Sequence, residues 1–356
     1  MTDESQWVEA PAREGAGPPR VSRRELAEAA VEACRRLLGV EATPEPWGGG
    51  PPPHYKRRQL SSIRLIAGEA TVIASRRRDA QVGRREAAAL TALGAHRAPA
   101  PRLFAADGEW LIQEDMGRLR LSQKLQDAKE SEGIGLLAAA AQGLWRCQEA
   151  GAKAGLAAHG GELTGYDKLL AAPARVAGLL KIPAPQIAAE RIQPLIAAPE
   201  SVFIKWDARP ANAILADDGA LFWIDWEEWG RRCRLDDLVW LVCDEWVPDW
   251  NNAGEEWITS EIHAHAAPFA GGVREAERYF AAYGALHLLV RVAVILTAKG
   301  REGWWDEELV HAHDLIGVTR ACVLRLLSRA ERFAAKVEAM SPLAEWIATL
   351  PARLPA

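Results

Sequence analysis

Phe203-Ile-Lys-Trp-Asp-Ala-Arg-Pro-Ala-Asn-Ala-Ile-Leu215, with Leu221-Phe-Trp-Ile-Asp-Trp-Glu227 shortly after it, is the most informative part of this chain. It places Asp207, Asn212 and Asp225 at intervals of five and thirteen residues, each close to an apolar, strand-like run. Polar side chains on loops beside strands are held rigidly and stay reachable. Hard oxygen ligands suit Mg²⁺, which keeps several waters and needs only one or two protein groups plus phosphate.

These three side chains indicate phosphoryl transfer. In this interpretation Asp207 orients and accepts the proton of an acceptor hydroxyl, while Asn212 and Asp225 hold Mg²⁺ on nucleotide phosphates. Each residue taken alone has an ordinary alternative: a capping or turn aspartate, a turn asparagine and a strand-end aspartate. Asp225 adjoins the apolar run Leu221–Ile224, where a charge is costly unless it is paired or bound to metal. The agreement of order, spacing and flanking runs favours the functional interpretation.

The bulk composition is that of an ordinary globular protein. A chain of 356 residues fits two lobes or two to three domains. Apolar residues make up 49 % and charged residues 26 %, and the net charge of −5 carries no electrostatic footprint of nucleic-acid binding. The five cysteines are odd in number, scattered and without a CxxC pair, so we expect a reduced, intracellular protein.

The N-terminal segment and the longest apolar segment do not predict a membrane partner. Residues 1–20 are polar and rich in Pro, Gly and Glu; they lack the apolar core of a signal peptide, and we predict a disordered tail. The longest apolar stretch, Ala281–Ala298, is interrupted by His287 and Arg291, which favours a buried helix over a membrane span. We therefore expect a cytoplasmic protein.

The first ordered region is predicted at residues 21–54. Ser22 and Glu25 form a capping box that starts a helix with one apolar face. Pro44–Pro53 is expected to end this helix and to form a stiff linker.

Residues 55–117 read as a small sheet lobe. Two apolar arms flank a hairpin turn at Ala67-Gly-Glu69, Arg84–Leu93 follows as a helix, and two short strands precede residue 114. From about Leu119 the chain is mainly helical. The predicted helices there are Gly135–Ala150, Asp167–Leu180, 272–298, 306–330 and 331–349.

The segment 202–241 resembles the aminoglycoside phosphotransferase and choline kinase superfamily. In that family the catalytic loop usually reads His-Gly-Asp-x-x-x-x-Asn, and the metal aspartate lies in an Ile-Asp-Trp/Phe segment. Here Lys205-Trp-Asp207 is followed by Asn212 and then by Ile224-Asp-Trp-Glu227. The family tends to place an Asp-Leu pair about a dozen residues later, which Asp237-Leu238 matches.

By motif order the resemblance spans about residues 55–330. It implies an α+β, bilobal protein-kinase-like fold. The small N-terminal antiparallel-sheet lobe, with one main helix and the hinge, would be residues 55–117. The larger, mostly helical lobe with the catalytic and metal-binding loops would be residues 118–356. The resemblance also implies ATP and Mg²⁺ as cofactors and a small-molecule hydroxyl as acceptor: an amino alcohol, amino sugar, sugar or amino-acid-like compound.

The resemblance assigns phosphate contacts in the small lobe. Ser61 and Ser62, with their backbone N–H groups, would cradle phosphate, as Ser or Asn often does at this place in the family. The family's third strand supplies a cation paired to a helix glutamate; here these would be Arg76 and Glu86. A register slip of one residue would put Ser75 in place of Arg76. The ordinary alternatives are a solvated charge run for the arginine and a surface glutamate for Glu86.

The resemblance also places the interlobe hinge at Gln113–Gly117. The backbone of this segment would meet the adenine edge, which assigns Glu114 and Met116 to the nucleotide site. No GxxxxGK[ST] motif occurs, so a P-loop enzyme is disfavoured.

Two departures from the family pattern keep an alternative open. Lys205 replaces the usual histidine, and arginine replaces the usual lysine of the third strand. We expect Lys205 to keep Asp207 ionised if their side chains meet. A catalytically degenerate nucleotide-binding or regulatory protein is the alternative function, and a protein kinase is a third.

The acceptor is the least determined part of the interpretation. Tryptophans and acidic residues are frequent between Trp223 and Trp250. If they line a pocket, this aromatic and acidic pocket would favour a cationic or sugar-like acceptor. The ordinary alternative is that these tryptophans fill the core. The sequence leaves open the acceptor, ATP versus GTP, the oligomeric state, and whether the changes at Lys205 and Arg76 abolish activity.

Overall fold

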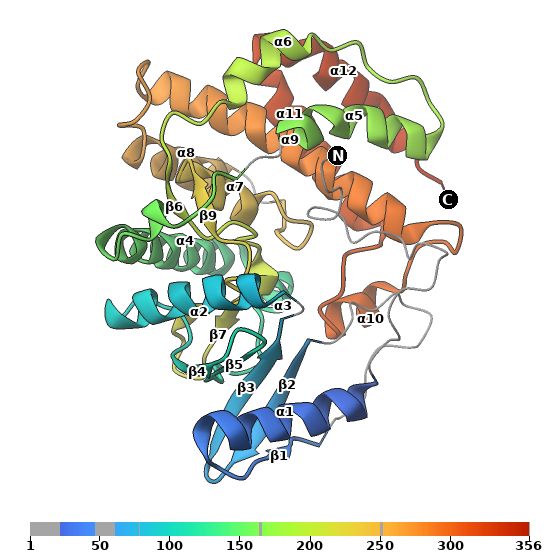
Figure 1. Ribbon diagram of the computed structural model, residues 1–356. Coiled ribbons are helices and arrows are strands. Elements are labelled where there is room, and N and C mark those ends of the chain that lie inside the picture. Colours follow the sequence, from blue (N-terminus) through green and yellow to red (C-terminus); the bar gives the residue numbers. More distant parts are fainter. Residues whose placement is uncertain (1–21, 47–60, 78, 164–165, 250–251, 356) are drawn as a thin grey trace.

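The computed structural model describes residues 22–46, 61–77, 79–163, 166–249 and 252–355 (Figure 1). The predicted tail at 1–20, most of the Pro/Gly linker and the strand start at 55–60 lie outside the described residues. The domain boundaries proposed from the sequence therefore stay predictions.

Helix α1 (Arg23–Leu38) begins with the predicted capping box. Ser22 Oγ accepts the N–H of Glu25 at 3.2 Å, and the Glu25 carboxylate accepts the N–H of Ser22 at 2.7 Å. The helix ends at Gly39, whose φ of 70° suits a residue without a side chain. Its apolar face covers one side of the N-terminal sheet.

That sheet has five antiparallel strands in the order β1-β2-β3-β5-β4. They are β1 (Thr43–Pro44), β2 (Ser62–Ala67), β3 (Ala70–Arg76), β4 (Leu103–Ala106) and β5 (Trp110–Glu114), with α2 (Ala80–Ala95) between β3 and β4. The predicted hairpin turn between β2 and β3 is confirmed, with Gly68 at φ 66°. Strand β1 corrects the sequence interpretation, which put Pro44 in the linker. Proline is tolerated there because β1 is an edge strand.

Alternation along the strands gives the sheet two different faces. Ile63, Leu65, Val72 and Ala74 are buried against α1. The residues between them, among them Ser62 and Ser75, lie on the opposite face. The contact between the end of β3 and Asp225, described below, shows that this second face is turned toward the rest of the molecule.

Helices dominate the rest of the chain and lie above the sheet in Figure 1. They are α3 (Leu121–Asp127), α4 (Glu130–Lys153), α5 (Tyr166–Leu180), α6 (Ala189–Ile192), α7 (Leu235–Val242), α8 (Asn252–Ala264), α9 (Val273–Lys299), α10 (Glu307–Ala312), α11 (Arg320–Ala335) and α12 (Ser341–Thr349). Two small antiparallel pairs interrupt them: β6 (Val202–Ile204) with β9 (Gly230–Arg232), and β7 (Ala213–Leu215) with β8 (Leu221–Trp223). The predicted bilobal α+β architecture is confirmed.

The predicted helix at 306–330 is wrong, because the structure has two helices there. Residues 313–319 separate α10 from α11, and Asp314 adopts a left-handed φ of 47°. A Cβ on Gly317 would lie 2.8 Å from both Cys322 Sγ and Glu245 Cγ. The backbone therefore packs too closely at this point for a continuous helix carrying side chains.

Helix α9 is long and apolar enough to cross a membrane by length and composition alone. However, 83 % of its apolar window is buried inside the protein, as expected of a core helix. The interpretation of Ala281–Ala298 as a buried helix is confirmed.

Candidate functional site

The Asp207 loop (residues 205–212) leaves β6 in a strained backbone conformation. Trp206 and Asp207 have φ values of 56° and 40°, in the left-handed region that residues with side chains rarely adopt. Such strain, of order 1–3 kcal/mol per residue, persists only where the surroundings enforce it, and it clusters at functional sites.

Asp237 is the group that holds this loop. It lies in the first turn of α7, and its carboxylate accepts the N–H groups of Lys205 at 2.9 Å and Trp206 at 2.8 Å. Gln148 Nε2 donates to it as well, at 2.9 Å. Burial raises the pKa of Asp237 to about 6, although these hydrogen bonds favour its charged form. The Asp237-Leu238 pair thus ties the helical core to the loop backbone.

Asp207 is fixed by two donors from its own loop. Asn212 Nδ2 lies 2.8 Å from Asp207 Oδ2 and 2.9 Å from the Asp207 carbonyl oxygen. Arg209 Nε donates to Asp207 Oδ1 at 3.0 Å. The side chain of Asp207 keeps 19 % exposure, so the carboxylate is oriented without being sealed from a reactant.

Asp225 reaches the same place through the β7–β8 hairpin. Asn212 directly precedes β7, and its carbonyl accepts the N–H of Ile224 at 2.9 Å. Asp225 follows with φ 60°, and its side chain keeps 27 % exposure. The hairpin therefore brings Asn212 and Asp225 together, while Asn212 contacts Asp207 directly.

Lys205 connects the Asp207 loop to the segment at Asp225. Its Nζ donates to the backbone carbonyl of Asp225 at 2.8 Å and lies 5.3 Å from the ring centre of Trp226. The expected contact between Lys205 and the carboxylate of Asp207 stays a prediction. Lys205 joins the two loops and so serves as a scaffold residue.

The cation paired with Glu86 is Arg77, and the predicted Arg76–Glu86 pair is wrong. Arg77 Nε and NH2 donate to the two oxygens of Glu86 at 2.6 and 2.9 Å. Arg77 also lies 3.4 Å from Asp225 and 3.2 Å from Glu227. Both partners of the Arg77–Glu86 pair are buried.

The predicted Arg76–Glu86 pair fails because Arg76 and Arg77 turn to opposite faces of the sheet. Arg76 shares a face of β3 with Val72 and Ala74, on the α1 side, and its guanidinium pairs there with the exposed Glu109 at 2.6 Å. A shift of one residue moves a strand side chain to the other face. Arg77 follows the last residue of β3 and takes the inner side. Ser75, the alternative kept open from the sequence, lies on this inner face too.

The two serines assigned to phosphate lie at the start of β2. Ser62 Oγ is 2.9 Å from Ser75 Oγ across the β2–β3 pair, and the Ser61 carbonyl accepts the N–H of Arg76 at 2.6 Å. Both serines are exposed. The Ser62 hydroxyl lies on the inner face with Ser75, so it remains a candidate for a phosphate contact. Ser61 directly precedes β2, at the alternate position, and is left with its backbone N–H for such a contact.

The predicted hinge is anchored by a residue to which sequence reasoning gave no firm role. Asp115 accepts from Arg64 NH2 at 2.5 Å, and the same NH2 donates to the Gly117 carbonyl at 2.7 Å. Glu114 turns its carboxylate to the N–H of Arg102 at 3.2 Å, toward β4. Met116 is half-buried. Hence the backbone of this segment, rather than the Glu114 side chain, is its available recognition surface.

Negative charge accumulates around Asp225. Partial burial and the charge of Asp225 raise the pKa of Glu227 to about 7, although Arg77 opposes this rise. Among the described residues no group of three or more His, Cys, Asp or Glu side chains forms a metal centre. One carboxylate and one carboxamide oxygen nevertheless suffice for Mg²⁺ that also binds phosphate. The oxygen donors and the excess of negative charge fit a divalent cation.

Sequence reasoning missed Arg209. This buried guanidinium stands beside Asp207, and it interacts electrostatically with Asp244, Glu245 and Asp314, which together keep it charged. The available signal was an arginine two residues after the candidate base, in the same loop. Arg209 is a fixed positive charge next to the candidate base.

Behind Arg209 lies a buried acid pair with unequal partners. Arg291 binds both oxygens of Glu245, at 2.9 and 2.6 Å, and keeps that carboxylate ionised. Asp244 Oδ1 accepts the N–H of Trp246 at 2.9 Å, whereas Asp244 Oδ2 is buried without a hydrogen-bond partner. Burial and the neighbouring Glu245 charge raise the pKa of Asp244 to about 7.

This raised pKa predicts how Asp244 affects stability as pH changes. Between about pH 4 and 7 the folded state holds a proton on Asp244 that the unfolded chain has released, so the free energy of unfolding falls as pH rises through this window. We expect the wild type to lose about 1–3 kcal/mol between pH 5 and 8 relative to Asp244→Asn. Urea unfolding at both pH values measures this. The exposed Asp217→Asn is the control, and a pH-independent difference for Asp244→Asn would contradict the expectation.

Comparisons with known proteins agree with this geometry at the level of fold. No protein-family model and no curated protein match the sequence. Solved structures do match. A presumed aminoglycoside phosphotransferase from Ralstonia eutropha is 14 % identical with a TM-score of 0.52, and the match covers 86 % of this chain and 98 % of that one.

A choline kinase from Cryptosporidium parvum matches with the same TM-score. It is 12 % identical with a TM-score of 0.52, over 90 % of this chain and 99 % of that one. At such identities the likeness shows the fold alone. The chain has the bilobal, protein-kinase-like fold of these proteins, and the fold expected from the sequence resemblance is confirmed.

Proposed function

We propose that this protein is an ATP- and Mg²⁺-dependent phosphotransferase that phosphorylates a hydroxyl of a small molecule. One observation carries the proposal: Asp207, Asn212 and Asp225 lie together at the end of a chain of contacts that continues through Arg77 to Glu86. The strained backbone at Asp207 and Asp225, enforced by Asp237 and Lys205, supports it.

In this function Asp207 orients the acceptor hydroxyl and takes its proton at one carboxylate oxygen. Arg209 supplies a fixed positive charge beside the reacting groups, and Asn212 keeps the carboxylate in place. Because phosphoryl transfer needs little covalent work from the protein, alignment and charge neutralisation provide most of the acceleration.

Asn212 and Asp225 would hold Mg²⁺, which neutralises the negative charge of the nucleotide phosphates when bound. Arg77, oriented by Glu86, takes the phosphate-binding role first assigned to Arg76. Ser62 would contact phosphate from β2, and Ser61 would do so through its backbone N–H. The backbone between Glu114 and Met116 would contact the base.

We further propose a small-molecule acceptor such as an amino alcohol, an amino sugar, a sugar or an amino-acid-like compound. We propose no nucleic-acid or membrane partner. A cytoplasmic location is consistent with the five free, buried cysteines.

A catalytically degenerate nucleotide-binding protein is the second candidate, and one contact favours it. The Arg77 guanidinium lies against both Asp225 and Glu227, at 3.4 and 3.2 Å, and so already neutralises part of the charge that would attract Mg²⁺. In an enzyme, metal and nucleotide would draw Arg77 away from these acids. In a degenerate protein the guanidinium would stay.

Titration of ATP with and without Mg²⁺ separates the two candidates. For the enzyme we expect Mg²⁺ to tighten ATP binding at least about tenfold in the wild type, and Asp225→Asn to remove most of this effect, since one metal ligand loses its charge. A screen of amino alcohols and sugars for phosphorylated product should then find an acceptor. ATP binding that ignores Mg²⁺ and Asp225→Asn, with no product, would leave the degenerate protein as the function.

A further inference from the structure

Trp206 carries a large side chain at a backbone position that suits glycine. Its φ of 56° lies in the left-handed region, where the side chain of an L-residue crowds the backbone and glycine does not. The residue is only 3 % exposed, so its indole is packed inside the protein. A buried indole at a strained position directly before the candidate base depends on contacts that hold it there.

The indole of Trp206 is held by Arg232 and by helix α7. The Arg232 guanidinium lies 5.5 Å from the ring centre of Trp206 and 5.2 Å from that of Tyr283, within the range of cation–π attraction for both rings. Trp240, in α7, packs against Trp206 with the ring centres 5.3 Å apart. Trp206 and Arg232 form the first of two arginine–tryptophan pairs beside the candidate site.

Asp236 fixes the orientation of Arg232. Its buried carboxylate accepts from Arg232 Nε and from the hydroxyl of Tyr279. The next residue, Asp237, accepts the N–H of Trp206 at 2.8 Å. Two successive acids in the first turn of α7 therefore support the same residue, one through its ring and the other through its backbone.

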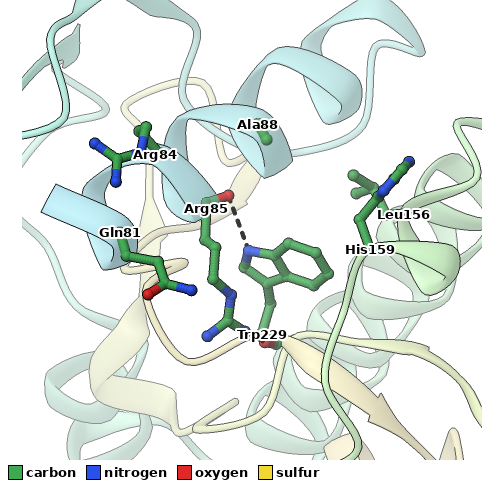
Figure 2. A pocket seen from close by; sticks show the side chains of 7 residues that line it. All are labelled: Gln81, Arg84, Arg85, Ala88, Leu156, His159 and Trp229. Atoms are coloured by element: carbon green, nitrogen blue, oxygen red, sulfur yellow. Dashed lines mark hydrogen bonds between the residues drawn. The ribbon is translucent and has the colours of Figure 1, made fainter.

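The segment that follows Asp225 carries the second pair, Trp229 with Arg85 of α2, at the edge of a cavity of about 280 Å³ (Figure 2). Trp229 is 1 % exposed, and its Nε1 donates to the Arg85 carbonyl at 3.0 Å. Arg85 NH2 donates to the Trp229 carbonyl at 2.6 Å, and its guanidinium lies 5.2 Å from the indole ring centre. Arg85 adjoins Glu86, which pairs with Arg77. The second pair thus ties this segment to the helix that orients Arg77.

We propose that the members of both pairs are positioning residues, each pair for one carboxylate of the candidate site. The first pair holds Asp207 in the orientation in which it accepts the hydroxyl proton, and the second holds Asp225 where it serves as a metal ligand. This assignment rests on the proposed function. Because misplacing a reacting group by about 1 Å can cost about a hundredfold in rate, buried rings affect the reaction without touching a reactant.

Hydrogen–deuterium exchange of the nucleotide-free protein tests this support without requiring activity. Trp206→Leu keeps an apolar side chain but offers Arg232 no ring, so the amides of residues 205–212 should exchange at least about fivefold faster, and those of 225–229 should not. Trp229→Leu should give the opposite pattern. Trp206→Phe keeps a ring for the guanidinium and should exchange as the wild type does.

Kinetics and nucleotide titration then separate positioning from a loss of stability, in conditions where urea unfolding shows every variant folded. Trp206→Leu should lower kcat about ten- to a hundredfold and leave the effect of Mg²⁺ on ATP binding unchanged, whereas Trp229→Leu should remove most of that effect. Trp206→Phe should keep kcat within about threefold of the wild type. Trp110→Leu is the matched control and should change neither quantity. Trp110 is 4 % exposed, and its ring centre lies 5.9 Å from the Arg76 guanidinium, on the α1 side of the small sheet.

Two kinds of result would overturn the proposal. One is unchanged exchange, or full kcat, in Trp206→Leu. The other is faster exchange throughout the protein, or equal losses of kcat and of the Mg²⁺ effect in both leucine variants, as expected of indoles that only stabilise the fold. The crossed exchange pattern in a wild type that transfers no phosphoryl group would keep the two supports and refute the phosphotransferase.

Discussion

Arg77→Ala should destabilise the protein by about 3–5 kcal/mol, because it leaves the carboxylate of Glu86 buried without its partner. Glu86 is 1 % exposed, and the coulombic attraction of Arg77 opposes the burial that raises its pKa. The proposed phosphate cation is lost with the same substitution, so ATP binding should weaken at least tenfold. Urea unfolding and calorimetry measure the two effects.

The neighbouring residue provides the control. Arg76→Ala removes an exposed guanidinium paired with the exposed Glu109, and such surface pairs contribute about 0–1 kcal/mol. We expect little change in stability or in ATP affinity. Arg77→Ala/Glu86→Ala should cost less than the sum of the single substitutions, because the uncompensated charge is gone. Equal effects of Arg76→Ala and Arg77→Ala would refute the register that the structure shows.

Asp207→Asn should lower the rate of phosphoryl transfer by about 10²–10⁴, because a carboxamide cannot accept the hydroxyl proton. Its oxygen can still accept from Arg209, and Asn212 keeps its bond to the backbone carbonyl of residue 207, so the loop should keep its shape. The affinity for ATP with Mg²⁺ should stay within about twofold, since Asp207 is not among the proposed metal ligands. The loss should appear in kcat with the acceptor found by the product screen.

Asp217→Asn, an exposed aspartate in the turn between β7 and β8, is the matched control and should keep full activity. Full activity in Asp207→Asn would remove the general base from the proposed mechanism. If the variant lost ATP binding together with turnover, Asp207 would instead belong to the nucleotide site.

The residues of the candidate site form one connected set of contacts. Asp237 fixes the Asp207 loop from α7, Lys205 joins that loop to Asp225, and Arg77 joins Asp225 to the small lobe. A strained backbone needs such support from several directions. The expected effects are therefore largest where a substitution removes a buried member of this chain of contacts.

Much of the fold and part of the site could be predicted from the sequence. The capping box at Ser22 and the hairpin turn at Gly68 depend on residues close together in the chain, and both predictions hold. The grouping of Asp207 with Asn212 was accessible for the same reason, since five residues of one loop separate them. The break within 306–330 was not accessible, because it depends on Gly317 packing against Glu245 and Cys322.

What the sequence by itself determined is the set of local elements and the order of the chemistry along the chain, because capping, turn geometry and apolar alternation act between near neighbours. Only the tertiary structure decided that Arg77 rather than Arg76 meets Glu86 and that Lys205 supports Asp225. These pairings join residues on different elements or depend on which face of a strand turns inward. A shift of one residue reverses that face while leaving the local pattern almost unchanged.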